Sequence, residues 1–301
     1  MMQTHGRAAV ALMMMTINTL VMALPILLLG LVKAILPEKW RKYLRPILMQ
    51  TAQGWVATNN LILTTISRPQ LCIEGELPDA PRRSCLVVAN HQSWADILLL
   101  QYLLHRRTPF LTFFLKRQLI WVPVLGLAWW ALDFPFMRRY SRAYLKKYPH
   151  KAGKDLALTR RACEKFRNIP VAIMVFPEGT RFSKEKHQNT QSPYKHLLRP
   201  KAGGVGYVLT LLGQQIQHVV DISFAYPSRQ TISFWNFLGG GLSPVKIRSK
   251  VHRIEPDIRC NYVEDPVCRS RVQTWINGIW HEKDEWLDVT FGTSVSNTHK
   301  P

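Results

Sequence analysis

Acidic side chains are scarce in this sequence of 301 residues. Asp and Glu number 19 against 40 Lys and Arg, so the formal net charge is +21. An excess of this size usually means an anionic partner, such as nucleic acid, a phosphorylated substrate or an acidic membrane surface. Because the sequence has neither zinc-finger spacing nor an aromatic-rich RNA-binding signature, we expect no nucleic-acid partner.

The cysteines indicate neither a disulfide framework nor a metal site. They are odd in number, lack a Cys-x-x-Cys pair and accompany no His cluster. We therefore predict reduced thiols on the cytosolic side and no bound metal. The cysteines are Cys72, Cys85, Cys163, Cys260 and Cys268. Internal repeats are also absent, and with 47% hydrophobic residues the chain length favours one sizeable core.

The longest uncharged stretch covers residues 8–32. About 20 apolar residues are enough to cross a bilayer core. A cleaved signal peptide is the alternative, but its apolar stretch is typically about 7 to 15 residues long and follows a basic start, whereas only Arg7 precedes this one. We predict a retained transmembrane anchor.

A basic connector at residues 33–45 separates this stretch from a second uncharged run at 46–67. The connector holds five basic residues and one acid, so the positive-inside rule places it in the cytoplasm and the N-terminus outside. Gln and Asn side chains in the second run favour a helix at the membrane interface over a second span. The sequence thus predicts an anchoring segment at 1–67 and one α/β domain at 68–301, on the cytoplasmic face of the inner membrane.

A strand, a turn and a helix are predicted in succession near the start of this domain. Residues 85–89 form a short apolar, β-branched run typical of a buried parallel strand, and the apolar stretch 97–104 has helix length. Between them lies the sequence Asn-His-Gln-Ser-Trp-Ala-Asp at 90–96. Open α/β sheets place ligand sites at such turns.

His91 and Asp96 in this turn fit a catalytic pair. On one continuous helix they would lie about 140° apart, so His91 must precede the helix. Ser93 and Asp96 have capping-box spacing, which predicts Ser93 as the N-cap and Asp96 in the first turn. His91 could then donate one ring N–H to Asp96 and act as a general base with the other nitrogen. The alternative is a capping Asp96 beside an ordinary polar turn residue.

A second predicted strand, residues 171–175, leads into Phe-Pro-Glu-Gly-Thr-Arg at 176–181. Pro and Gly favour a turn that directs its polar side chains outward. Arg181 offers a planar fork suited to phosphate, Thr180 a hydroxyl, and Glu178 an acceptor for Arg181 or a substrate hydroxyl. A turn with a solvated Glu–Arg pair is the alternative.

Together, the two motifs resemble the glycerolipid acyltransferase family, the lysophosphatidate acyltransferases. The hallmark blocks of that family are His-x4-Asp and Phe-Pro-Glu-Gly-Thr-Arg, and both occur here in the family's order. The resemblance spans roughly residues 86–227 and includes 114–116 and 130–139, which are similar to segments that line the acceptor site. The fourth block is matched loosely by 219–227, where Asp221 interrupts an apolar strand.

The resemblance implies a mixed-sheet α/β acyltransferase domain and direct transfer without a cofactor. His91, oriented by Asp96, would deprotonate the acceptor hydroxyl, which attacks the thioester of acyl-CoA or acyl carrier protein. The residues implied in substrate binding are Glu178, Gly179, Thr180, Arg181, Lys116 and Arg139 or its neighbour Arg138.

The implied reaction converts 1-acylglycerol-3-phosphate to phosphatidate. The partners would be a lysophospholipid, an acyl thioester and the membrane, and the basic run at 138–167 would follow lipid phosphates. The alternatives are an acyltransferase for another lysophospholipid and a non-catalytic basic membrane scaffold.

Overall fold

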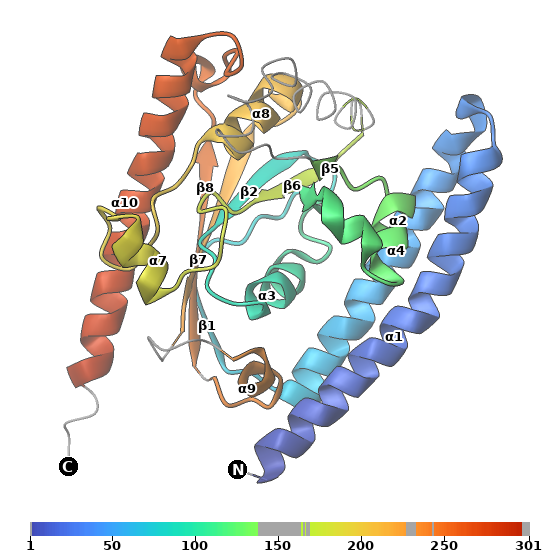
Figure 1. Ribbon diagram of the computed structural model, residues 1–301, viewed down its shortest axis with the longest axis horizontal. Helices are drawn as coiled ribbons and strands as arrows, with labels where there is room; N and C mark the ends of the chain where they lie inside the picture. Colours follow the sequence, from blue (N-terminus) through green and yellow to red (C-terminus); the bar gives the residue numbers. More distant parts are fainter. Residues whose placement is uncertain are drawn as a thin grey trace.

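The structure is a computed structural model that describes residues 2–137, 164, 166, 169–226, 233–242 and 244–296 (Figure 1). Arg138, Arg139, Cys163 and most of the basic run at 138–167 lie outside the described residues.

A six-stranded sheet forms the centre of the molecule. Its strand order is β1-β8-β7-β2-β6-β3, and all neighbours are parallel except β7 and β8, which are antiparallel. The predicted mixed sheet is therefore confirmed. The strands are β1 (Leu71–Gly75), β2 (Cys85–Ala89), β3 (Leu111–Phe113), β6 (Ala172–Val175), β7 (His218–Ala225) and β8 (Val245–Arg253), with a separate pair β4 (Leu115–Lys116) and β5 (Phe136–Met137).

Helices cover both faces of the sheet (Figure 1). Every side chain of β2 is buried, because Val87 and Ala89 point into one core and Leu86 and Val88 into the other. The first core includes α3 (Ala95–Leu104) and α9 (Phe234–Leu238), and the second includes α8 (Gly203–Leu212) and α10 (Pro266–Ser296). The remaining helices among the described residues are α1 (Met2–Ile35), α2 (Glu38–Ile62), η1 (Leu63–Ser67), η2 (Arg117–Trp121), α4 (Leu125–Ala131), α7 (Lys184–Asn189) and η4 (Pro256–Ile258).

The two N-terminal helices form a long hairpin along one side of the molecule (Figure 1). Asn59, one of the polar residues that argued against a second span, accepts a hydrogen bond of 2.8 Å from Nδ2 of Asn18 inside this hairpin. By length and composition, Gln3–Ile35 is the helix in the described part of the chain that could cross a membrane. Its outward apolar side chains are exposed, for example Leu24 at 62%.

Both ends of α1 contact the rest of the protein. Near the N-terminus, Nε1 of Trp235 donates to Nδ1 of His5 at 2.8 Å, and near the other end Nζ of Lys33 lies 2.8 Å from Oδ2 of Asp133. Both contacts form with residues of the 68–301 domain, so α1 packs against this domain near each of its ends. The orientation predicted from charge, with the N-terminus outside, stays a prediction.

The cysteine prediction is wrong for one pair, because Cys260 and Cys268 form a disulfide. The chain turns between η4 and the start of α10, which brings the two Cα atoms to 5.7 Å, within the range of a disulfide. Among the described cysteines, Cys72 and Cys85 are free, and burial raises the pKa of the Cys85 thiol to about 12. The paired cysteines thus give no support to a reducing environment.

Candidate active site

The two sequence motifs meet at one edge of the sheet. Strands β2 and β6 are parallel neighbours, so the turns that follow their carboxyl ends lie side by side. Two hydrogen bonds join them: the N–H of Phe182 donates to the carbonyl of His91 at 2.7 Å, and the N–H of His91 donates to the side-chain Oε1 of Glu178 at 3.2 Å.

The His91 imidazole pairs with a fully buried carboxylate. Its Nδ1 lies 2.8 Å from Oδ2 of Asp96, and the Asp96 side chain is 0% exposed. The same oxygen accepts hydrogen bonds from the N–H groups of Gln92 at 2.6 Å and Ser93 at 2.9 Å. Helix α3 has Trp94 rather than Ser93 as its N-cap, but Asp96 is in the first turn as predicted.

The pairing with Asp96 fixes which nitrogen of His91 is available for chemistry. A Nδ1–H that donates to the carboxylate leaves Nε2 with a lone pair. The ring stacks on Phe176 with centroids 4.0 Å apart, and His91 lines a cavity of about 380 Å³. This arrangement can remove a proton from a bound hydroxyl group.

Four more predicted site residues line this active-site cavity: Lys116, Gly179, Thr180 and Arg181. The guanidinium of Arg181 lies 4.8 Å from the centroid of the Trp94 ring. Gly179 has φ +71°, a left-handed conformation that favours glycine. The remaining lining is largely apolar, with Ile97, Phe113, Leu115, Leu119, Met174 and Tyr207 among its members.

Glu178 is directed inward. Its side chain is buried, and its two oxygens accept hydrogen bonds of 3.2 Å from the N–H groups of His91 and Leu198. Burial raises its pKa to about 8, although these two hydrogen bonds and nearby Lys283 oppose the shift. The alternative of a solvated Glu–Arg pair is therefore wrong. Glu178 supports the turn that carries His91, and its contact with substrate stays a prediction.

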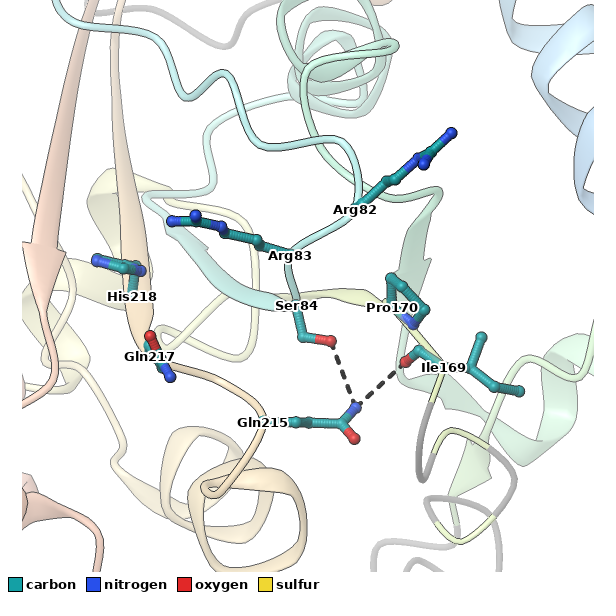
Figure 2. Close-up of a pocket in the computed structure, with 8 residues that line it drawn as sticks. All are labelled: Arg82, Arg83, Ser84, Ile169, Pro170, Gln215, Gln217 and His218. Atoms are coloured by element: carbon teal, nitrogen blue, oxygen red, sulfur yellow. Dashed lines mark hydrogen bonds between the residues drawn. The ribbon is translucent and has the colours of Figure 1, made fainter.

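A larger cavity, of about 560 Å³, lies at the opposite edge of the sheet, where β2, β6 and β7 begin (Figure 2). Nε2 of Gln215 donates to Oγ of Ser84 at 3.4 Å and to the carbonyl of Ile169 at 3.3 Å along its wall. Arg82 and Arg83 point in different directions in Figure 2, so the two guanidinium groups do not converge on one point. His91 and Asp96 belong to the other edge.

Comparison with known proteins decides the family. The acyltransferase family model matches residues 70–222, more than half of the chain. The chain belongs to the acyltransferase family. It is 24% identical over 249 residues to 2-acyl-1-lysophosphatidylinositol acyltransferase from Saccharomyces cerevisiae, covering 70% of this chain and 62% of the relative. It is 23% identical over 262 residues to mouse 1-acyl-sn-glycerol-3-phosphate acyltransferase delta, covering 82% of this chain and 62% of the relative.

The chain thus spans about 60% of the length of these curated relatives. Among solved structures, it is similar to the 1-acyl-sn-glycerophosphate acyltransferase PlsC from Thermotoga maritima. That match has a TM-score of 0.49 and 18% identity, covering 98% of this chain and 99% of that one.

Two residues of this acyltransferase site were missed in the sequence. The hydroxyl of Tyr226, directly after β7, donates to Oδ1 of Asp96 at 2.5 Å. Its pKa is raised well above the usual value by burial and by the charge of Asp96, so it remains a donor. The Asn90 amide exchanges hydrogen bonds of 2.9 and 2.8 Å with the carbonyl and N–H of Phe224. The available signal in the sequence was a polar residue directly after a predicted buried strand, Asn90 after β2 and Tyr226 after β7.

The structure brings seven of the nine predicted site residues of the acyltransferase together. His91 and Asp96 form the pair, Glu178 supports their turn, and the other four line the cavity. Arg138 and Arg139 lie outside the described residues, directly after β5. Across the described part of the chain, no group of three or more His, Cys, Asp or Glu side chains could hold a metal ion.

Proposed function

We propose that this acyltransferase moves a fatty acyl group from a thioester donor to the free hydroxyl of a lysophospholipid, with His91 as general base. The observation that carries this proposal is the 2.8 Å contact between Nδ1 of His91 and the buried Asp96, at a cavity that also holds Arg181 and Lys116. A positioned base and a cationic recognition site therefore open into one apolar space.

In the proposed reaction, Nε2 of His91 takes the proton of the acceptor hydroxyl, and the oxygen attacks the thioester carbonyl. Asp96 stabilises the imidazolium that forms. When the tetrahedral intermediate collapses, the carbon–sulfur bond breaks and the thiolate takes the proton back from His91. The products are an ester and a free thiol, and no acyl-enzyme is formed.

The acceptor we propose is 1-acylglycerol-3-phosphate, and the product is phosphatidate. Arg181 supplies a planar cation for its phosphate, Lys116 a second charge, and the apolar lining a surface for an acyl chain. Another lysophospholipid is the alternative, since one relative is named for lysophosphatidylinositol. The donor is acyl-CoA or acyl carrier protein, and no cofactor takes part.

We place the protein at the inner membrane with its active site facing the cytoplasm, where these donors occur. The exposed apolar side chains of α1 support membrane association, because many large apolar side chains exposed on one helix are unusual in a protein surrounded by water. They include Met13, Ile17, Leu20, Leu24, Leu28 and Leu31.

Membranes that contain the protein test the proposal. Free thiol should be released from acyl-CoA only when lysophosphatidate is added, and phosphatidate should form in equal amount. A panel with lysophosphatidylinositol and lysocardiolipin ranks the acceptors. A non-catalytic scaffold would give no acceptor-dependent thiol release with any of them, which would refute the proposal.

A further inference from the structure

Another cavity lies against the 176–181 turn, and His91 is not part of its lining. It has a volume of about 370 Å³, and Thr180 lines both this cavity and the active-site cavity. We call it the basic pocket. Its lining consists of Glu178, Thr180, Lys186, Thr190, Gln191, Leu198, Arg199 and Lys201.

The charge of the basic pocket is positive. Lys186, Arg199 and Lys201 contribute three cations, and none of them forms an ion pair with a carboxylate in the described part of the chain. Nζ of Lys186 instead donates to Oγ1 of Thr180 at 2.9 Å. Glu178 is the acid in the lining, and because burial raises its pKa to about 8 it opposes an anion weakly near neutral pH.

Hydrogen bonds to its backbone groups hold the basic segment at 198–202 in place. The N–H of Leu198 donates to Oε2 of Glu178 at 3.2 Å, and the N–H of Lys201 donates to the carbonyl of Pro177 at 2.9 Å. From α10, the amide of Gln273 donates to the carbonyl of Pro200 at 3.1 Å and accepts from Ala202 at 3.1 Å. The segment is thus fixed between the 176–181 turn and α10.

Arg199 and Lys201 are exposed on either side of the buried Pro200. Both side chains line the basic pocket. The two cations thus extend into one space from a fixed backbone, and an anion bound there requires little reordering of the chain.

Two phosphorylated substrates are candidate ligands of this pocket. They differ in how far the phosphate lies from the reacting group. The acceptor hydroxyl must reach Nε2 of His91 within hydrogen-bond distance. In lysophosphatidate the phosphate is only a few bonds from that hydroxyl, so it belongs in the active-site cavity with Arg181 and Lys116. In a thioester donor, the phosphate lies at the far end of a pantetheine arm from the reacting thioester. It therefore needs an anion site outside the active-site cavity but within reach of this arm.

We propose that the basic pocket binds the phosphate of the acyl donor's carrier, with Arg199, Lys201 and Lys186 as its ligands. This inference rests on the proposed function. The pantetheine arm would pass Thr180 between the two cavities. Acyl-CoA and acyl carrier protein both carry a phosphate at this end of the arm, so the shared ligand is a phosphopantetheine phosphate.

The test is steady-state kinetics on the full chain with Arg199 and Lys201 both replaced by Gln, with Lys186→Gln as an independent variant. We expect the Michaelis constant for acyl-CoA to rise about tenfold or more, because each lost contact is charge-assisted, while that for lysophosphatidate stays unchanged. Lys184→Gln is the matched control: it removes one exposed cation from the same helix as Lys186, outside the pocket. Thermal unfolding checks that each variant is folded.

Donor variation identifies the source of the phosphate. An acyl-pantetheine thioester without phosphate should be a poorer donor than acyl-CoA for the wild type, and the double variant should lose this preference. A rise in the constants for both acyl-CoA and acyl carrier protein supports a phosphopantetheine site, and a rise for acyl-CoA alone supports a site for the nucleotide phosphates.

Two outcomes would overturn the inference: a rise confined to the lysophosphatidate constant, which would make the pocket an acceptor site, or no change in any constant. Both differ from failure of the proposed function, in which the wild type itself would show no acceptor-dependent thiol release.

Discussion

Tyr226 and Asp96 form a buried hydrogen bond in which the phenolic hydroxyl donates to Oδ1 of the carboxylate. The other oxygen of Asp96 is held by Nδ1 of His91 and by the N–H groups of Gln92 and Ser93. Both oxygens are therefore fixed, and the carboxylate cannot rotate away from the imidazole without losing several bonds. Tyr226 acts through Asp96, as a positioning residue.

Replacement of Tyr226 by Phe should lower kcat about tenfold, the order expected from a lost hydrogen bond to a charged group. The Michaelis constants should change little, since Tyr226 lines neither substrate cavity. Tyr194→Phe is the matched control, because its hydroxyl donates to the carbonyl of Asn277, remote from Asp96. If both variants lose stability and neither loses kcat, Tyr226 has only a structural role.

The His91–Asp96 pair was predictable because it is local. The five-residue separation between a predicted strand and a predicted helix required His91 to precede the helix and placed Asp96 in its first turn, and the structure has both residues there. Tyr226 is 130 residues from Asp96 in the sequence, and their contact depends on β7 lying beside β2. Local patterns carry no information on strand order, so this contact required the structure.

The same limit explains the inward direction of Glu178 and the contacts of α1. Glu178 has the sequence context of an exposed turn, but the N–H of Leu198, 20 residues away, closes over it. Likewise, charge counting at residues 33–45 could not reveal that Trp235 would contact His5 across a separation of 230 residues. The pairing of Cys260 with Cys268 depends on the turn after η4 and has no spacing signature.

Arg181→Lys should raise the Michaelis constant for the lysolipid more than that for the thioester. A point charge replaces a planar fork that binds phosphate bidentately, and the stacking on Trp94 weakens. Initial rates with each substrate varied in turn measure the two constants. A change in the donor constant alone would mean that the 176–181 turn binds the donor.

Glu178 should make the folded state less stable as the pH rises. Its folded pKa of about 8 lies above the ordinary value of 4.5, so between these values the folded protein binds more protons than the unfolded chain, and the free energy of unfolding falls. Glu178→Gln cannot ionise, and its stability should vary less over this range. Thermal midpoints of the purified protein at pH 5, 6.5 and 8 measure the difference.

Glu185→Gln, at an exposed position in α7, is the control for the loss of one carboxylate. Equal pH dependence in the wild type and in Glu178→Gln would show that Glu178 is ionised throughout this range.

A cysteine near the N-terminus and one in α7 should report the same side of the membrane. With Cys72 and Cys163 replaced by Ser, single cysteines at Gln3 and at Lys184 can be probed in intact cells with an impermeant maleimide. The contacts at both ends of α1 predict that both are protected until the cells are permeabilised. Labelling of Gln3→Cys with protection of Lys184→Cys would instead support the topology predicted from charge, with the N-terminus outside.

The most direct test of the catalytic assignment is lysophosphatidate-dependent thiol release from acyl-CoA by His91→Ala, compared with the wild type at equal protein in the membrane. Since His91 is a partly exposed turn residue, expression should be nearly unchanged. Because a positioned base is lost, we expect the rate to fall by about 100-fold or more. Turnover of His91→Ala at the wild-type rate would contradict the assignment of His91 as the catalytic base.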